Sequence, residues 1–269
     1  MGISQTENER PMVLETKDLT IRFGGLTAVS HLNLQIRKNV IYGLIGPNGA
    51  GKTTVFNLIT QHYKPTEGQV LFNGNCLRKE KPAQVVKMGM ARTFQNIRLF
   101  TGLSVRDNVV IAMHMRLDVS WWMSMLGLKS YQKKENAMYE KADKLLKRTG
   151  LYEFAEHEAG SLPYGLQRRL EIARALATEP ELLLLDEPAA GMNPQEVTEL
   201  TKFIREIRDE FDITILLIEH HMSLVMNLCE EITAISYGKE IAHGNPEDIK
   251  NDAQVIEAYL GVDKDAKGK

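Results

Sequence analysis

The first part of the chain shows the short repeat that is typical of β-strands. Apolar and polar residues alternate over 12–23 and 32–36, which predicts two strands, the first interrupted near Lys17 and Asp18. Residues 40–45 form an almost continuous apolar run that leads into a glycine-rich turn, as expected of a short buried strand. We therefore predict that this part of the chain forms sheet.

Helical spacing becomes frequent beyond the glycine-rich turn. Residues 53–60 are predicted to form a helix, 68–72 another strand, and most of 104–177 further helices. Ser104 followed by Asp107 is typical of a capping box, so we expect one helix to begin directly after Ser104. A mainly helical segment thus separates two parts that contain strands.

Strands and helices alternate again beyond residue 181. Apolar runs at 182–185 and 213–218 predict two strands, and 194–208 predicts a helix with Pro194 in its first turn. Two apolar strands joined by a helix indicate a parallel sheet that is covered on both faces. The pattern predicts an α/β core interrupted by a helical insertion.

The composition narrows the class of protein. The 269 residues include 33 Lys and Arg against 35 Asp and Glu, and this formal charge of −2 gives no reason to expect a nucleic-acid partner. With 43% hydrophobic residues, the chain is able to bury a sizeable core. Its apolar runs are much shorter than the roughly 20 residues of a membrane span. Cys76 and Cys229 predict reduced thiols rather than a disulfide framework.

Polar segments are expected at both ends of a single domain. Residues 1–11 lack the features of a signal peptide and are interpreted as a disordered leader, although Gly2 and Thr6 match a myristoylation pattern. Residues 262–269 are interpreted as a solvated tail. No internal repeat or low-complexity linker divides the residues between them.

The glycine-rich turn matches the phosphate-binding pattern G-x-x-x-x-G-K-[ST]. Its residues are Gly46, Pro47, Asn48, Gly49, Ala50, Gly51, Lys52 and Thr53. The glycines let backbone N–H groups approach phosphate oxygens, and the following helix adds its N-terminal N–H groups. Lys52 is expected to neutralise the β- and γ-phosphates, and Thr53 to ligate Mg²⁺. A glycine turn beside a surface lysine is the alternative, but the flanking strand and helix favour a nucleotide site.

Two acids follow the strand predicted over 182–185. Asp186 and Glu187 are expected at the carboxyl edge of the sheet, where open α/β folds bind ligands. Asp186 is suited to hold Mg²⁺, and Glu187 to polarise the water that attacks the γ-phosphate. By themselves these acids fit any exit from a strand. Together with the glycine-rich loop they indicate hydrolysis of a nucleotide.

The order of five motifs resembles that of ABC-type ATPase subunits. The motifs are GPNGAGKTT at 46–54, Gln95 in RTFQNIRLF, LPYGLQRRLEIARAL at 162–176, LLLLDEP at 182–188 and His220 in LLIEHHM. The resemblance runs over 13–261 and implies a P-loop NTPase fold with a RecA-like parallel-sheet core, an N-terminal antiparallel β subdomain and a helical insertion. It implies one ATPase domain over 12–261, with the core at 12–97 and 179–261 and the helical subdomain at 98–178.

The resemblance also implies roles for single residues. Phe23 takes the place of the aromatic residue that stacks on adenine, although a residue of the core is an alternative. Gln95 resembles the glutamine that reaches Mg²⁺ and the attacking water, and His220 the switch histidine that contacts the γ-phosphate. Thr54 completes the nucleotide-binding loop. His221 stands where many relatives carry an acid, and no role is assigned to it.

The signature segment departs from the usual Leu-Ser-Gly-Gly-Gln. The residues at the signature positions here are Leu162, Pro163, Tyr164, Gly165 and Leu166. In this family two ATPase subunits pack head to tail. The resemblance therefore places the signature against the partner's nucleotide. Pro163 lacks the hydroxyl and the N–H of a serine, but it suits the first turn of a helix. Gly165 keeps the position of close approach. We therefore predict a heterodimer whose second subunit brings an intact signature to this chain's site.

Within the family, the sequence resembles the ATP-binding subunits of branched-chain amino acid importers. The similar segments are FGGLTAV at 23–29, ARTFQNIRLF at 91–100, LDEPAAGMNP at 185–194 and the C-terminal NPEDIK and VIEAYLG. The implied ligands are ATP and Mg²⁺. The implied partners are two transmembrane permease subunits and, through the complex, an extracytoplasmic solute-binding protein, with the chain at the cytoplasmic face of the cell membrane.

Two other functions stay open at the level of sequence. One is the ATPase subunit of a lipid or lipopolysaccharide exporter, and the other is a soluble ABC-type ATPase that is not linked to transport. The sequence lacks the heptads and cysteine pairs common in the soluble class. The extra segment with Trp121 and Trp122 argues against the exporter. Two interpretations of these tryptophans stay open: they dock on a membrane subunit, or they pack within the helical part.

Overall fold

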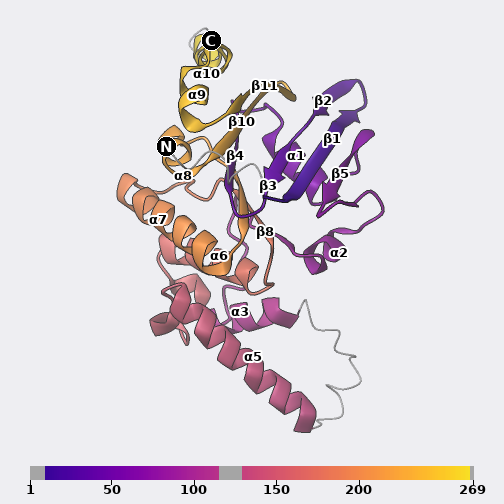
Figure 1. Ribbon diagram of the computed structural model, residues 1–269. Helices are drawn as coiled ribbons and strands as arrows, with labels where there is room; N and C mark the ends of the chain where they lie inside the picture. The colour runs from indigo at the N-terminus through magenta and orange to yellow at the C-terminus, as the bar shows by residue number, and fades with distance from the viewer. Residues whose placement is uncertain (1–9, 115–128, 267–269) are drawn as a thin grey trace.

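The fold consists of two sheets and a separate group of helices (Figure 1). The computed structural model describes residues 10–114 and 129–266, so the segments with Gly2, Thr6, Trp121 and Trp122 lie outside the described residues. The antiparallel sheet has the order β2-β1-β5-β6, with β3 paired to β1. Its strands are β1 (Met12–Phe23), β2 (Leu26–Leu32), β3 (Gln35–Arg37), β5 (Glu67–Phe72) and β6 (Asn75–Cys76).

The second sheet has the order β11-β10-β4-β9-β8-β7. Its strands are β4 (Ile41–Ile45), β7 (Met90–Arg92), β8 (Leu182–Asp186), β9 (Thr214–Ile218), β10 (Glu231–Ser236) and β11 (Lys239–Gly244). All neighbours in this sheet run parallel except β10 and β11. The carboxyl ends of β4, β8 and β9 therefore meet at one edge, where the phosphate-binding loop and the two acids begin.

Helices lie on both faces of the parallel sheet, and a helical group extends from one end. The core helices are α1 (Lys52–Ile59), α2 (Pro82–Lys87), α6 (Tyr164–Leu176), α7 (Pro194–Phe211), α8 (Met222–Leu228), α9 (Pro246–Asn251) and α10 (Ala253–Ala266). The helical group contains α3 (Val105–His114) and α5 (Lys129–Arg148), with short 3₁₀ turns at Tyr152–Phe154 and Ala159–Ser161. Figure 1 shows this group at the end opposite α10.

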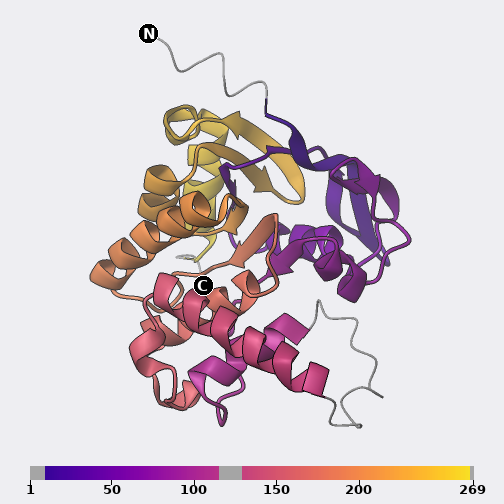
Figure 2. The same ribbon diagram turned by 60° about the horizontal axis from the view of Figure 1, so that its bottom comes forward.

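Alternate residues of the parallel strands belong to two hydrophobic clusters. On β4, Tyr42 and Leu44 pack in the cluster that contains the antiparallel sheet and α1. Ile41 and Ile45 pack in the cluster that contains residues of α6, α7 and α8. Figure 2 shows the antiparallel sheet and the helices α7 and α8 on opposite sides of the parallel strands. The parallel sheet is thus covered on both faces, as its apolar strands predicted.

The predicted strand over 32–36 is wrong, because Leu32 ends β2 and a separate strand, β3, begins at Gln35. Asn33 interrupts the pairing: its side chain accepts a hydrogen bond from Asp18 N–H at 2.9 Å and donates to His31 O at 3.0 Å. Such local side-chain hydrogen bonds compete with a strand ladder. The predicted interruption near Asp18 is confirmed, since its φ is 47° and the register of β1 shifts there.

The ends of several helices follow local sequence signals. Ser104 Oγ accepts the N–H of Asp107 at 3.0 Å and donates to its carboxylate at 2.7 Å, so the predicted cap of α3 is confirmed. Helix α10 continues to Ala266, into the segment interpreted as a tail. Cys76 is exposed and Cys229 is buried, and both thiols are free. The described residues contain no helix that is both long and apolar enough to cross a membrane.

Candidate active site

The phosphate-binding loop joins β4, in the middle of the parallel sheet, to α1. Gly46 has a φ of 154°, and a Cβ at this position would lie 2.2 Å from the carbonyl oxygen of Ile235. At Gly51, which precedes α1 with a φ of 103°, a Cβ would lie 2.8 Å from Ala28 O. Both positions therefore require glycine for a close approach of backbone segments. The loop is held against β10 and β2 before any ligand binds.

Lys52 is only 6% exposed and folds back onto the loop. Its Nζ donates to Gly46 O at 2.6 Å and to Pro47 O at 3.1 Å. Burial lowers the pKa of Lys52, whereas the carboxylates of Glu187 and Asp186 oppose this shift. The ammonium group therefore lies beside the loop, with backbone carbonyl groups as its partners.

Asp186 ends β8 with its side chain almost fully buried. Its Oδ2 accepts a hydrogen bond from Arg92 Nη2 at 2.7 Å, and the side chains are 5% and 7% exposed. Arg92 also donates to Asn57 Oδ1 at 2.7 Å, which joins β8 and β7 to α1. The sequence analysis missed Arg92, because an arginine on a three-residue strand carries no recognisable signal. The ion pair fixes where the Asp186 carboxylate points.

The residues predicted to ligate Mg²⁺ suit that ion chemically. Thr53 is exposed in the first turn of α1, and Asp186 and Gln95 add carboxylate and amide oxygens. Mg²⁺ prefers oxygen ligands and usually binds one or two carboxylates together with substrate phosphates. The donor set therefore fits Mg²⁺.

Glu187, Gln95 and His220 come together from three separate segments. Gln95 Nε2 donates to Glu187 Oε2 at 2.8 Å, and His220 Nδ1 lies 3.7 Å from the same oxygen. Glu187 has a φ of 46°, and its N–H donates to Ile218 O at 2.9 Å. The left-handed backbone at Glu187 directs its side chain toward Gln95 and His220.

These side chains line a cavity beside the phosphate-binding loop, which we name the phosphate cavity. It has a volume of about 670 Å³ and is lined by Gly46, Pro47, Asn48, Gln95, Glu187, His220, Tyr259 and Leu260. Six of these residues were predicted from the sequence: three belong to the loop itself, and Gln95, Glu187 and His220 come from three separate segments. The sequence analysis assigned no role to Tyr259 and Leu260, which come from α10.

Glu219 is a second residue that the sequence analysis missed. Its side chain is fully buried, and Oε1 accepts the N–H of Ala189 at 2.8 Å. Its Oε2 accepts the N–H groups of His220 at 3.0 Å and His221 at 3.2 Å, and lies 3.1 Å from the His221 ring. Glu219 therefore links the loop after β8, which carries Glu187, to the loop after β9, which carries His220.

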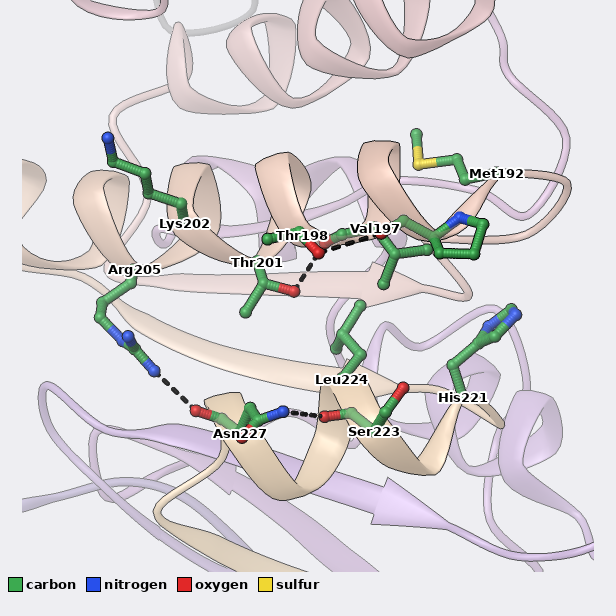
Figure 3. Close-up of a pocket in the computed structure, with 11 residues that line it drawn as sticks. Met192, Val197, Thr198, Thr201, Lys202, Arg205, His221, Ser223, Leu224 and Asn227 are labelled. Carbon is green, nitrogen blue, oxygen red and sulfur yellow. Dashed lines mark hydrogen bonds between the residues drawn. The ribbon is translucent and has the colours of Figure 1, made fainter.

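The two adjacent histidines line different cavities. His220 lines the phosphate cavity, whereas His221 lines a cavity of about 610 Å³ between α7 and α8 (Figure 3). In this second cavity Arg205 donates to Asn227 O at 2.6 Å, and Asn227 donates to Ser223 O at 2.8 Å. His221 thus does not line the phosphate cavity, although its ring lies 4.4 Å from that of His220.

Helix α6 positions Gln95 through a buried ion pair. Arg168 is fully buried and donates to Phe94 O at 2.8 Å and Gln95 O at 2.9 Å. Glu171 accepts from Arg168 at 2.7 Å and from the N–H groups of Phe94 and Arg98 at 3.3 and 3.4 Å. Burial raises the pKa of Glu171, and Arg168 opposes this rise. The pair holds the backbone on both sides of Gln95.

Phe23 and the signature residues lie away from the phosphate cavity. Phe23 is 46% exposed and packs edge-on against Tyr63, with 5.4 Å between ring centroids, so it is not a residue of the core. Pro163 directly precedes α6 as its N-cap residue, with an extended ψ of 149°. Tyr164 donates to Ala190 O at 3.0 Å. None of the described cavity-lining residues lies in 162–165.

The fold and the site are those of a P-loop nucleotide hydrolase, in which a lysine of the phosphate-binding loop lies near acids at the end of a neighbouring parallel strand. The model of the family "ABC transporter" matches residues 29–190, and that of "Branched-chain amino acid ATP-binding cassette transporter" matches 239–265. The chain belongs to the ABC transporter family, as one of its ATP-binding subunits. The predicted fold and the predicted ATPase activity are confirmed.

Relatives and solved structures agree with this assignment. The chain is 46% identical to the high-affinity branched-chain amino acid transport ATP-binding protein LivG of Escherichia coli K12, covering 93% of this chain and 98% of LivG. It is 43% identical to BraF of Pseudomonas aeruginosa, over 93% of this chain and 98% of BraF. An ATP-binding cassette of an ABC transporter in its ADP conformation superposes with a TM-score of 0.82 at 30% identity, covering 93% of this chain and 99% of that chain.

Proposed function

We propose that this chain is the ATP-hydrolysing subunit of an importer for branched-chain amino acids. The observation that carries the proposal is the convergence of Glu187, Gln95 and His220 on a cavity beside the phosphate-binding loop. The similarity to the branched-chain amino acid transport proteins LivG and BraF supports this cargo, as does the family match over residues 239–265. These relatives favour the importer over the exporter and over a soluble ATPase.

Binding of ATP uses groups that the loop already presents. The glycines leave the backbone N–H groups of the loop free of Cβ atoms, and α1 adds the positive end of its dipole. Lys52, now held by Gly46 O and Pro47 O, exchanges these carbonyls for phosphate oxygens. Phe23 is exposed and available to stack on adenine, with Tyr63 beside it. Thr53, Asp186 and Gln95 would hold Mg²⁺, which would neutralise phosphate charge.

Hydrolysis requires a base that accepts a proton from water. Glu187 takes this role: the water oxygen bonds to the γ-phosphorus, the bond to the β–γ bridging oxygen breaks, and the proton passes to the carboxylate. Gln95 orients Glu187 and the water, since it donates to Glu187 at 2.8 Å. His220, 3.7 Å from the same carboxylate oxygen, faces the γ-phosphate. The products are ADP and phosphate.

The chain works as part of an assembly. ABC ATPases act as dimers with membrane subunits, and another solved cassette at 23% identity is itself dimeric, with ADP and phosphate bound. We propose a head-to-tail heterodimer in which residues 162–165 face the partner's nucleotide, below two permease subunits that receive cargo from an extracytoplasmic binding protein. The chain would be peripheral on the cytoplasmic face of the membrane, as one ATPase domain over 12–261.

Replacement of Glu187 tests the proposed chemistry. Glu187→Gln keeps the size of the side chain but removes the base, so we expect turnover to fall by at least about 100-fold while ATP binding persists. The measurement is phosphate release by the assembled complex, with retention of labelled ATP. Glu199→Gln, an exposed acid on α7, is the matched control and should leave turnover unchanged. Rapid hydrolysis by Glu187→Gln would remove Glu187 from this role.

A further inference from the structure

Helix α10 borders the phosphate-binding loop on two sides. Tyr259 and Leu260 line the phosphate cavity together with Pro47 and Asn48. The same two loop residues also line a neighbouring cavity of about 680 Å³, whose other wall includes Gln254, Glu257 and Ala258 of α10. Helix α10 is held by contacts with α9 and β11, near the top of Figure 1. The tip of the loop and this helix therefore line the same two cavities.

The hydroxyl of Tyr259 is buried without being satisfied. The ring packs against the hydrophobic cluster of the helical face, whereas the hydroxyl oxygen has no hydrogen-bond partner among the described residues. Burial raises the pKa of Tyr259, and the nearby backbone N–H of Gly46 opposes this rise. Tyr259 and Gly46, the first residue of the phosphate-binding loop, line the same cavity.

The chemistry of this position points to a missing acceptor. A phenolic hydroxyl is both a donor and an acceptor, and no described residue takes either role toward Tyr259. The O–H hydrogen therefore remains available. A buried donor without a partner is unfavourable, and most such groups in folded proteins find an acceptor. Phosphate oxygens are strong acceptors, and the loop beside Tyr259 is built to bind them.

We propose that Tyr259 donates a hydrogen bond to a terminal phosphate oxygen of bound ATP, so that α10 supplies a substrate-contacting residue that favours ATP over ADP. This inference rests on the proposed function, because it requires the γ-phosphate to occupy the cavity lined by Glu187, Gln95 and His220. Leu260, which is 59% exposed, adds an apolar wall to the same cavity. The segment responsible lies within the matched C-terminal region 239–265.

The test removes only the hydroxyl. In Tyr259→Phe the ring remains, so we expect the affinity for the non-hydrolysable analogue AMP-PNP to fall about tenfold, since hydrogen bonds to charged acceptors are the strong ones. The affinity for ADP should stay within about twofold. Both affinities are measured with Mg²⁺ by isothermal titration calorimetry on the full-length chain. The ratio of the affinity for AMP-PNP to the affinity for ADP, measured on one sample, does not depend on the fraction of the protein that is folded.

Controls separate this inference from the proposed function. Tyr152→Phe, which alters an exposed tyrosine of the helical part, should leave both affinities unchanged. An equal loss for both nucleotides would mean that Tyr259 only supports the loop, and no loss would mean that it does not contact the nucleotide; either result overturns the inference. If wild-type protein binds AMP-PNP no better than Lys52→Ala does, the proposed function itself fails.

Discussion

The ammonium group of Lys52 is buried before any phosphate reaches it. Two loop carbonyls replace water around it, and its pKa is lowered because these dipoles and two nearby carboxylates compensate only in part for lost hydration. The site therefore holds a cation that an anionic ligand will stabilise. Tyr259 is the complementary case, a neutral donor that awaits an acceptor. Both residues therefore favour the binding of a negatively charged ligand.

The lowered pKa of Lys52 predicts proton uptake on ATP binding at alkaline pH. Phosphate oxygens favour the ammonium form, so the pKa rises in the complex. Between the two pKa values the free lysine is neutral and the bound lysine is charged; affinity therefore falls by up to about tenfold per pH unit as pH rises through this window. Below the lower pKa the effect vanishes. Calorimetry in buffers of different ionisation enthalpy measures this proton uptake. Lys52→Arg should abolish the uptake. Equal binding heats in all buffers would contradict the prediction.

The candidate catalytic residues lie on loops that are linked to one another by buried polar contacts. Each catalytic candidate is held by a partner on another element: Arg168 and Glu171 of α6 hold the backbone around Gln95, and Glu219 joins the loops after β8 and β9. Arg92 of β7 directs the carboxylate of Asp186. These buried ion pairs and hydrogen bonds make the loops one unit, because breaking any of them leaves polar groups unsatisfied.

Glu219 should contribute strongly to stability as well as to activity. Glu219→Ala leaves the N–H groups of Ala189, His220 and His221 without their acceptor. We expect a loss of about 3 kcal/mol in the free energy of unfolding, measured with urea, and slower ATP turnover in the refolded complex. Glu199→Ala on exposed α7 should change stability by less than about 0.5 kcal/mol. A comparable effect of the two substitutions would show that Glu219 does not link the loops.

In the proposed head-to-tail dimer, the active site would be divided between two chains. The signature residues lie away from this chain's own phosphate cavity, and Tyr164 instead bonds to the loop after β8. Pro163 caps α6 through its carbonyl, which accepts from Leu166 and Gln167 N–H at 2.9 and 3.0 Å. A proline is compatible with this role because the cap uses only its carbonyl group. In the proposed head-to-tail dimer, the effect of Pro163 on catalysis would fall on the partner's nucleotide.

Pro163→Ser is expected to act on the partner's site alone. Serine restores a hydroxyl and an N–H toward the partner's γ-phosphate, and it is also a favoured residue before a helix. We expect turnover at the partner's site to rise by about tenfold, since a single donor to a transferring group has effects of this order or larger. Phosphate release is measured in complexes with Lys52→Ala, which leaves only the partner's site active. A rise that requires Lys52 instead would contradict head-to-tail packing.

The sequence by itself determined the features that depend on local geometry. The loop from Gly46 to Thr53 was predictable because glycine alone tolerates its backbone, and the acids after β8 because an apolar run ends there. The resemblance to known ATPases added Gln95 and His220. The folded structure was needed to show that Arg92 pairs with Asp186, that Glu219 links two loops, and that Tyr259 and Gly46 line one cavity. Residues distant in sequence leave no periodic signal of their contact, because packing and burial bring them together only when the chain folds.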